Sequence, residues 1–230
     1  MILQIETATS ACSIALSHNG ELLVCREVDQ RNVHAEKITL FIDEVMAIAG
    51  IGYNDLDAVA VSCGPGSYTG LRIGVSTAKG LCFALNKPLI AVETLEAMAQ
   101  GMREKEDLAA NALLCPMIDA RRMEVFTAVF DASGNKIRPV SADIIDAESL
   151  SDLLRDRQMI FFGDGAAKCR SVLGHNSHAV FVDDFVNSAR YLTKIATEKF
   201  LSNDFADVAY FEPFYLKDFI AGKKPGKAYS

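Results

Sequence analysis

The chain has 230 residues, of which 50% are hydrophobic and 23% charged, so it has the composition of a globular protein and the length for one large domain or two modest lobes. Its net charge of −7, with a basic cluster only at residues 223–227, argues against a protein that binds nucleic acid strongly by itself. The sequence contains no apolar run of about 18 residues and no export signal, and its six cysteines form no Cys-x-x-Cys pair. We therefore expect a cytoplasmic protein with reduced thiols, no membrane span and no zinc site.

The N-terminal segment has the pattern of three antiparallel strands. Apolar runs predict strands over residues 1–6, 12–17 and 21–27, joined by a polar turn and by a hairpin at His18-Asn19-Gly20. Glu6 closes the first strand, as an acidic residue does in actin-, hexokinase- and Hsp70-like lobes, where the following hairpin handles phosphate. A glycine in such a hairpin lets backbone N–H groups approach a phosphate, whereas this chain has Thr7 and Thr9 in that segment. The hairpin is therefore either a vestigial nucleotide site or a structural turn with capping hydroxyls.

An amphipathic helix is predicted over residues 34–49, ended by Gly50. Its apolar stripe consists of Ile38, Phe41, Ile42, Val45 and Ile48. His34 at the helix start would need further ligands to bind a metal, and nothing nearby supplies them. We therefore interpret His34 as a surface or capping histidine.

The stretch that follows predicts a strand, a glycine turn and a long helix. The strand covers residues 56–62, the turn is Gly64-Pro65-Gly66, and the helix runs from an N-cap at Ser67 to residues 86–88. The pattern matches neither a P-loop nor a nucleophile elbow. Gly70 and Gly74 share one helix face, and two helical glycines cost roughly 1 kcal/mol each relative to alanine, so another backbone is expected to pass close by. That backbone belongs either to this chain or to a partner's helix.

The remaining chain repeats the opening pattern. After a strand at 89–92 and a helix from Thr94, a charged patch at 103–107 predicts a boundary between an N-terminal lobe (1–105) and a C-terminal lobe (106–230). Strands at 112–119 and 123–130 and a third from residue 136 echo the first three, with Asp119 in the place of Glu6. We further expect a helix over 144–157, strands at 159–162 and 179–182, a helix capped by Ser188 and an ordered tail at 212–217. Gly163-Asp-Gly165 either supports an adenosine, as in actin-like ATPases, or forms an ordinary turn.

Four segments closely resemble the TsaB (YeaZ) family over nearly the full length of the chain. They are Ile5–Leu16, Cys63–Gly74, Ile118–Val125 and Glu212–Lys217, and the block Gly-Pro-Gly-Ser-Tyr-Thr-Gly-Leu-Arg is specific to TsaB and its paralogue TsaD. The resemblance implies an α/β, two-lobed actin-like/Hsp70-like (ribonuclease H-like) fold with mixed sheets flanked by helices. It also implies a bacterial, cytoplasmic subunit of the complex that makes threonylcarbamoyladenosine beside the tRNA anticodon.

The same resemblance implies a subunit without catalysis of its own. TsaD carries a pair of metal-binding histidines where this chain has Thr94 and Met98, neither of which is a useful ligand for such a metal. The expected role is a scaffold that binds and activates TsaD, with TsaE joining the pair. We expect tRNA to be contacted only indirectly and a homodimer to form when the partner is missing. No cofactor is expected, with ATP or ADP only within the complex.

The resemblance also implies specific surfaces. The partner interface would comprise His34, Glu36, Lys37, Phe41, Tyr68, Gly70, Leu71, Gly74 and Lys79. A vestigial nucleotide site would comprise Glu6, Thr7, Thr9, Asp119, Arg121, Gly163 and Gly165. The alternative is an actin-like small-molecule kinase or ATPase that uses this second set, while a protease, as an older family name has it, lacks any supporting triad or metal cluster.

Overall fold

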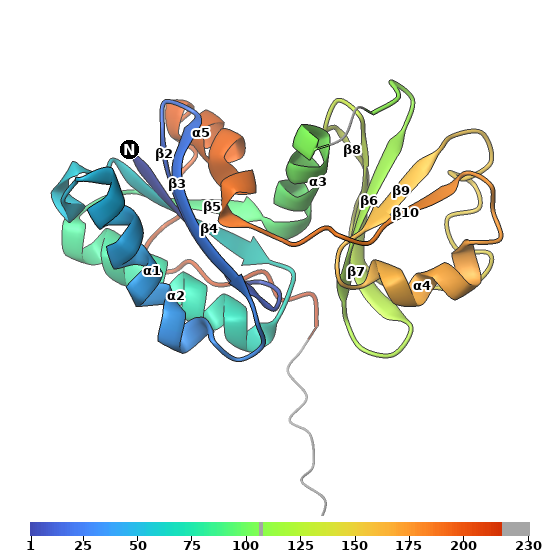
Figure 1. Cartoon of the computed structure of the whole chain (residues 1–230), viewed down its shortest axis with the longest axis horizontal. Coiled ribbons are helices and arrows are strands. Elements are labelled where there is room, and N and C mark those ends of the chain that lie inside the picture. Colours follow the sequence, from blue (N-terminus) through green and yellow to red (C-terminus); the bar gives the residue numbers. More distant parts are fainter. Residues whose placement is uncertain (106–107, 218–230) are drawn as a thin grey trace, which may run out of the picture.

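A computed structural model of the chain describes residues 1–105 and 108–217, which form two lobes, each built on a five-stranded sheet (Figure 1). The first sheet contains β1 (Ile2–Glu6), β2 (Ala11–His18), β3 (Glu21–Asp29), β4 (Ala58–Gly64) and β5 (Leu89–Glu93). The second contains β6 (Leu113–Asp119), β7 (Glu124–Asp131), β8 (Lys136–Ile144), β9 (Met159–Phe162) and β10 (Ala179–Val182). The α-helices are α1 (His34–Ala49), α2 (Tyr68–Leu85), α3 (Thr94–Lys105), α4 (Ala166–Leu173) and α5 (Thr193–Leu201), with short 3₁₀ turns η1 (Tyr53–Asp55) and η2 (Ala189–Leu192). No helix in the described ranges is long and apolar enough to cross a bilayer.

Both sheets have the same topology. The strand orders are β3-β2-β1-β4-β5 and, read in the same sense, β8-β7-β6-β9-β10. In each sheet the first three strands are antiparallel and the last two run parallel to the central one. Glu6 and Asp119 therefore end equivalent strands, which confirms the predicted internal echo.

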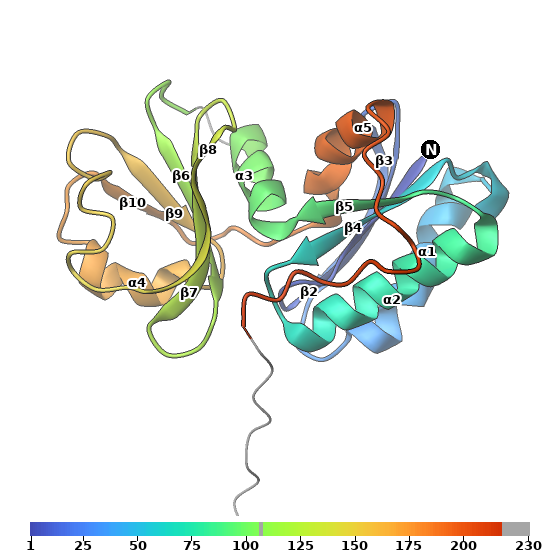
Figure 2. The ribbon, with the colours of Figure 1, turned by 180° about the vertical axis from the view of Figure 1, so that it is seen from behind.

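The first sheet is buried on both faces. Alternate residues of β1, such as Leu3 and Ile5, pack with α1 and α2, whereas Ile2 faces the core shared with α3 and α5. Figures 1 and 2 show α1 and α2 side by side on one face and α3 and α5 on the other. The helix α3 also packs against β6 and β7, so one hydrophobic core continues from the first sheet into the second.

The chain returns to the first lobe after it has built the second. η2 contacts β1 and β2, and α5 contacts β1 and β5. Residues 206–217, which we call the strap, then run along α2, as Figure 2 shows. Ala206 N donates to Leu89 O at 2.9 Å, and Phe214 N donates to Cys63 O at 2.7 Å. The predicted division at 105/106 therefore does not describe the packing, because η2, α5 and most of the strap belong to the first lobe.

Most predicted helices and strands are confirmed. Two helix assignments and the burial of one residue differ from the prediction. The helix predicted over 144–157 is wrong: β8 extends to Ile144, and residues 147–156 form successive turns in which Leu150 has a φ of 60°. Side-chain hydrogen bonds such as Ser149 Oγ to Asp146 Oδ1 at 2.7 Å compete with a continuous helix there, and only isolated turns form. The helix α4 was not predicted, and Ile48, placed in the buried stripe of α1, is 53% exposed.

Candidate functional site

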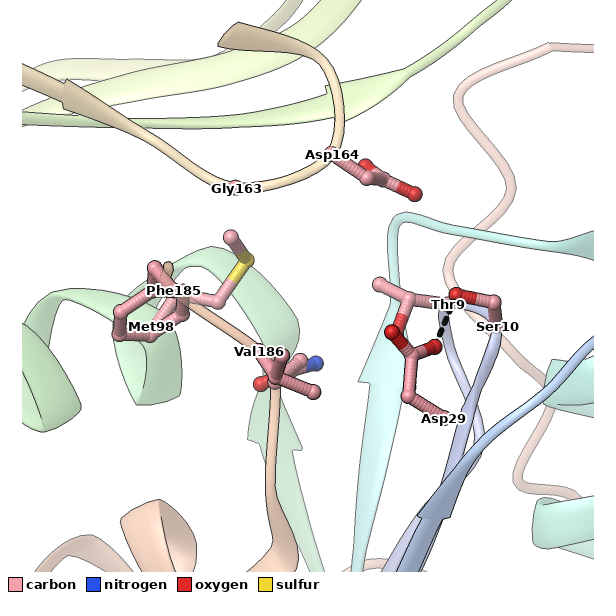
Figure 3. A pocket seen from close by; sticks show the side chains of 9 residues that line it. Thr9, Ser10, Asp29, Met98, Gly163, Asp164, Phe185 and Val186 are labelled. Atoms are coloured by element: carbon pink, nitrogen blue, oxygen red, sulfur yellow. Dashed lines mark hydrogen bonds between the residues drawn. The ribbon is translucent and has the colours of Figure 1, made fainter. Parts of the chain in front are cut away.

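A small pocket lined by both polar and apolar residues lies between the two lobes (Figure 3). Its walls are formed by Thr9, Ser10, Asp29, Met98, Gly163, Asp164, Phe185, Val186 and Asn187. The room inside is about 40 Å³, whereas one water in the liquid takes about 30 Å³ and sites for small-molecule ligands measure roughly 300–1,000 Å³. This pocket is therefore far smaller than a typical site for a small-molecule ligand.

The glycine pair beside this pocket is explained by packing within the chain. A Cβ added at Gly163, where φ is +96°, would lie 2.5 Å from both Met117 O and Met98 Cε. At Gly165 it would lie 2.9 Å from the carbonyl carbon of Ile118. Close contacts within the chain therefore account for both glycines, which supports the interpretation as an ordinary turn.

Glu6 is fully buried beneath the cleft, at the end of β1. Burial raises the pKa of its carboxyl from 4.5 to about 7, although the Ala8 N–H, which donates to Oε1 at 2.5 Å, and the side chains of Ser62 and Asn187 lower it in part. Its Oε2, the Ser62 hydroxyl and the Asn187 amide nitrogen are all buried without a hydrogen bond of good geometry. Burial thus favours the protonated form of Glu6, which is about half populated near pH 7.

The two threonines of the first hairpin are engaged in local structure. Thr7 Oγ1 donates to Gly70 O at 2.9 Å, which ties the hairpin to the first turn of α2. Thr9 Oγ1 accepts from Ala11 N at 3.3 Å. These contacts support the interpretation of the segment as a structural hairpin with capping hydroxyls.

In the equivalent hairpin of the second lobe, a lysine of the same chain neutralises the charge of Asp119. Lys168 contacts the Asp119 carboxylate and donates to Glu124 O at 2.7 Å. Asp119 also accepts from Arg121 N at 3.0 Å. Of the residues predicted for the vestigial site, Thr9 and Gly163 line the pocket, and Thr7, Asp119, Arg121 and Gly165 do not. Across residues 1–105 and 108–217, no three His, Cys, Asp or Glu side chains gather as metal ligands would.

Four residues predicted at the partner interface face inward instead. A Cβ at Gly70 would lie 2.1 Å from Thr7 O, and one at Gly74 would lie 2.2 Å from Thr7 Oγ1, so the backbone that passes close to these glycines is the chain's own β1–β2 hairpin. Leu71 is buried in the same region. His34 is also buried rather than a surface histidine, because its Nε2 lies 3.0 Å from Thr9 O and 3.2 Å from Ala11 O. The glycine row therefore serves internal packing, and placing it on the partner surface is wrong.

Lys79 has a further structural role. Its ammonium donates to Ala209 O at 3.2 Å and to Phe211 O at 2.8 Å, which holds the strap against α2. Glu36 is exposed, and Lys37, Phe41 and Tyr68 are half-buried. These four residues are therefore at least partly exposed.

A different row of α1 and α2 residues is exposed, which we call the outer helical face. It consists of Leu40, Ile48, Ser76, Gly80, Phe83 and Ala84. Phe83 is 85% exposed, which is unusual for a phenylalanine, and a Cβ at Gly80 would meet nothing within 4 Å. Ser76, Gly80 and Ala84 repeat at intervals of four, so this row of small residues allows another helix to approach closely. The sequence contained this second row, but periodicity alone did not tell which of the two rows faces outward.

Comparison with known proteins identifies the relatives of the chain. Residues 27–221 match the family model "TsaD: tRNA N6-adenosine threonylcarbamoyltransferase". A protein from Haemophilus influenzae, "tRNA threonylcarbamoyladenosine biosynthesis protein TsaB", is 32% identical, and the alignment covers 98% of each chain.

Solved structures agree with this similarity. The structure "YeaZ from Pseudomonas aeruginosa" superposes with a TM-score of 0.79 at 26% identity over 94% of this chain and 99% of that one. The activator of the 2-hydroxyisocaproyl-CoA dehydratase from Clostridium difficile, solved with bound ADPNP, has a TM-score of 0.54 at 7% identity over 88% and 96% of the two chains. The second likeness concerns the fold alone, which is the two-lobed actin-like architecture with two mixed sheets.

Proposed function

The chain belongs to the TsaB family of tRNA threonylcarbamoyladenosine biosynthesis proteins, and on that premise we propose that it is the scaffold subunit of the modifying complex. In this role it binds a TsaD-family protein and orders that protein's active site for threonylcarbamoyl transfer to the adenosine beside the tRNA anticodon. It has no catalytic activity of its own. The observation that carries this proposal is the outer helical face, which exposes apolar and small side chains on two adjacent helices.

Two features of the chain support a role without catalysis. Thr94, at the first position where TsaD has a metal-binding histidine, is buried, and its hydroxyl accepts from Gly64 N at 3.2 Å. Met98, at the second position, is a buried core residue next to Gly163. The pocket between the lobes is also much smaller than a typical small-molecule site.

The outer helical face has the chemistry of a docking surface for a partner helix. Small residues at 76, 80 and 84 let a helix approach α2 closely, and Phe83 and Leu40 supply exposed apolar area. Burying a phenylalanine contributes about 1.5–3 kcal/mol, which is a ten- to hundredfold change in affinity. The polar residues Glu36 and Lys37 lie at the start of α1, where they suit the rim of such an interface.

We further propose the other partners that the family implies. When the TsaD-family protein is missing, the exposed patch favours a homodimer of this chain through the same helices. TsaE joins the heterodimer as an ATPase, and any ATP or ADP is bound within that complex. The chain acts in the cytoplasm, and tRNA reaches it through the complex.

Co-elution with the TsaD-family protein of the same organism tests the interface. Phe83→Asp and Gly80→Leu are expected to weaken the complex ten- to hundredfold, because the first places a charge and the second a bulky side chain in the contact. Leu201→Asp is the matched control, since Leu201 is 75% exposed at the end of α5, outside this face. Unchanged co-elution of both Phe83→Asp and Gly80→Leu would exclude the outer helical face as the interface.

Reconstitution tests the absence of catalysis. The chain alone is expected to turn over no threonylcarbamoyl-adenylate, and transfer to tRNA should appear when TsaD- and TsaE-family proteins are added. Calorimetric titration with Mg-ATP addresses the alternative of an actin-like kinase or ATPase. Micromolar affinity of the isolated chain, together with slow hydrolysis, would favour that alternative over a scaffold.

A further inference from the structure

The turn between β6 and β7 contains two consecutive residues with strained backbone. Arg121 has a φ of 74° and Arg122 a φ of 50°, in the left-handed region that glycine and asparagine adopt most readily. Such strain persists where the side chains are needed for something other than folding. The turn would be relaxed by Asn and Gly, so the presence of two arginines calls for a function of their guanidinium groups.

Two acidic residues next to this turn are paired with lysines, and a third, Asp164, accepts from Asp119 N at 3.0 Å. Asp119 contacts Lys168, and Glu124 contacts Lys217 of the strap. Arg121 and Arg122 are exposed and form no ion pair with any part of the chain that the structure describes. The tip of the turn is therefore locally positive, although the whole chain has a net charge of −7.

The strap links this turn to an aromatic pair, because Lys217 contacts Glu124 at the start of β7. Two residues before Lys217, Tyr215 packs on Tyr68 with ring centroids 4.8 Å apart and an interplanar angle of 33°. The Arg72 guanidinium lies over the Tyr68 ring, 5.4 Å from its centroid. Tyr215 is 37% exposed, so part of its ring is open to a further planar group. We call Arg72, Arg121, Arg122 and Tyr215 the arginine–tyrosine lip.

We propose that the arginine–tyrosine lip contacts single-stranded RNA directly. Arg121 and Arg122 bind backbone phosphates, and an unpaired base stacks on Tyr215, which Tyr68 and Arg72 support from behind. Cationic side chains beside stacked aromatic rings are the combination that recognises unpaired nucleotides without reading their sequence. The inference that the RNA is a tRNA held by the complex rests on the proposed function. The inference that the ligand is single-stranded RNA rests only on the residues of the lip. The net charge of −7 keeps this contact weak in the isolated chain.

The test exploits the strain in the turn. The double variant Arg121→Asn/Arg122→Gly relaxes the backbone and removes both charges, so its melting temperature is expected to rise by about 2–4 °C while RNA binding falls. Binding is measured by fluorescence anisotropy of a labelled tRNA anticodon stem–loop at several salt concentrations, with the full chain alone and with its TsaD-family partner. Loss of two phosphate contacts should reduce the slope of log K against log salt by about 1.4. Arg155→Asn/Arg157→Asn, which removes two arginines from the second lobe elsewhere, is the matched control and should change neither quantity.

Two results would overturn the proposal. One is a double variant that is more stable yet binds the stem–loop with unchanged affinity and salt slope. The other is a polyglutamate peptide that binds the lip more tightly than the RNA does, which would assign the lip to an acidic protein. A wrong scaffold proposal gives a different result, because no complex with the TsaD-family protein would then form. RNA binding by the chain alone, and its loss in the double variant, could still be measured.

Discussion

Replacing Glu6 by glutamine removes a fully buried carboxyl group while keeping its shape. The Oε1 atom of a glutamine can still accept from Ala8 N, as the glutamate does at 2.5 Å. The amide nitrogen would take the place of Oε2, which has no hydrogen-bond partner of good geometry. The variant therefore resembles the protonated form of Glu6 at every pH.

The size and sign of the effect follow from the pKa of Glu6. Burial raises it from 4.5 to about 7, and at about 1.4 kcal/mol per pH unit this corresponds to about 3 kcal/mol. Below pH 4.5 Glu6 is protonated in both the folded and the unfolded chain, so its ionisation costs nothing. Between pH 4.5 and about 7 the folded chain retains a proton that the unfolded chain releases, so stability falls as the pH rises. Above pH 7 the full cost is present, and Glu6→Gln should be more stable than the native chain by up to about 3 kcal/mol.

Urea unfolding between pH 4.5 and 8.5 measures this difference. The free energies of unfolding of the native chain and Glu6→Gln should coincide near pH 4.5 and separate up to pH 7, which is a large effect for a domain whose total stability is about 5–15 kcal/mol. Glu36→Gln, at an exposed position in the first turn of α1, is the control and should follow the native chain throughout. Parallel curves for the native chain and Glu6→Gln across this range would refute the argument that Glu6 is held protonated by burial.

Two further predictions concern α2 and the strap. Gly74→Ala should destabilise the chain by about 1–3 kcal/mol, because its Cβ would lie 2.2 Å from Thr7 Oγ1. Gly80→Ala should stabilise the chain by about 1 kcal/mol, because a Cβ at Gly80 would have nothing within 4 Å. Urea unfolding measures the stability of both variants. A Gly74→Ala variant more stable than Gly80→Ala would contradict the inward orientation of Gly74. Lys79→Met should speed hydrogen exchange of the strap amides, because it removes the bonds to Ala209 O and Phe211 O. Equal protection in the variant and the native chain would mean that Lys79 does not hold the strap.

Local sequence signals predicted the elements of the first lobe well. Ser67 was expected to cap α2, and its hydroxyl accepts from Gly70 N at 3.2 Å. Gly50 was expected to end α1, and it adopts the left-handed conformation there with a φ of 67°. Such caps depend on the few residues next to them, so they can be read from the sequence without knowledge of the tertiary structure.

Features set by distant contacts could not be predicted in the same way. The helical spacing of Gly70 and Gly74 is equally consistent with an inner and an outer face, and only the position of Thr7 across the fold decides between them. The buried residues Ile145, Leu150 and Leu154 have spacings close to those of a helix, yet they cover the second sheet from a series of turns. The pocket is small because Met98 and Phe185 from distant parts of the chain close it, and neither residue was among those predicted for the vestigial site.

The return of the chain end to the first lobe has a consequence for synthesis on the ribosome. The edge strand β5 receives its hydrogen-bonded neighbour Ala206 only after the second lobe has been made. Until α5 emerges, the parts of β1 and β5 that it contacts stay open to water or to chaperones. The first lobe therefore cannot complete its native packing before the second lobe has been made.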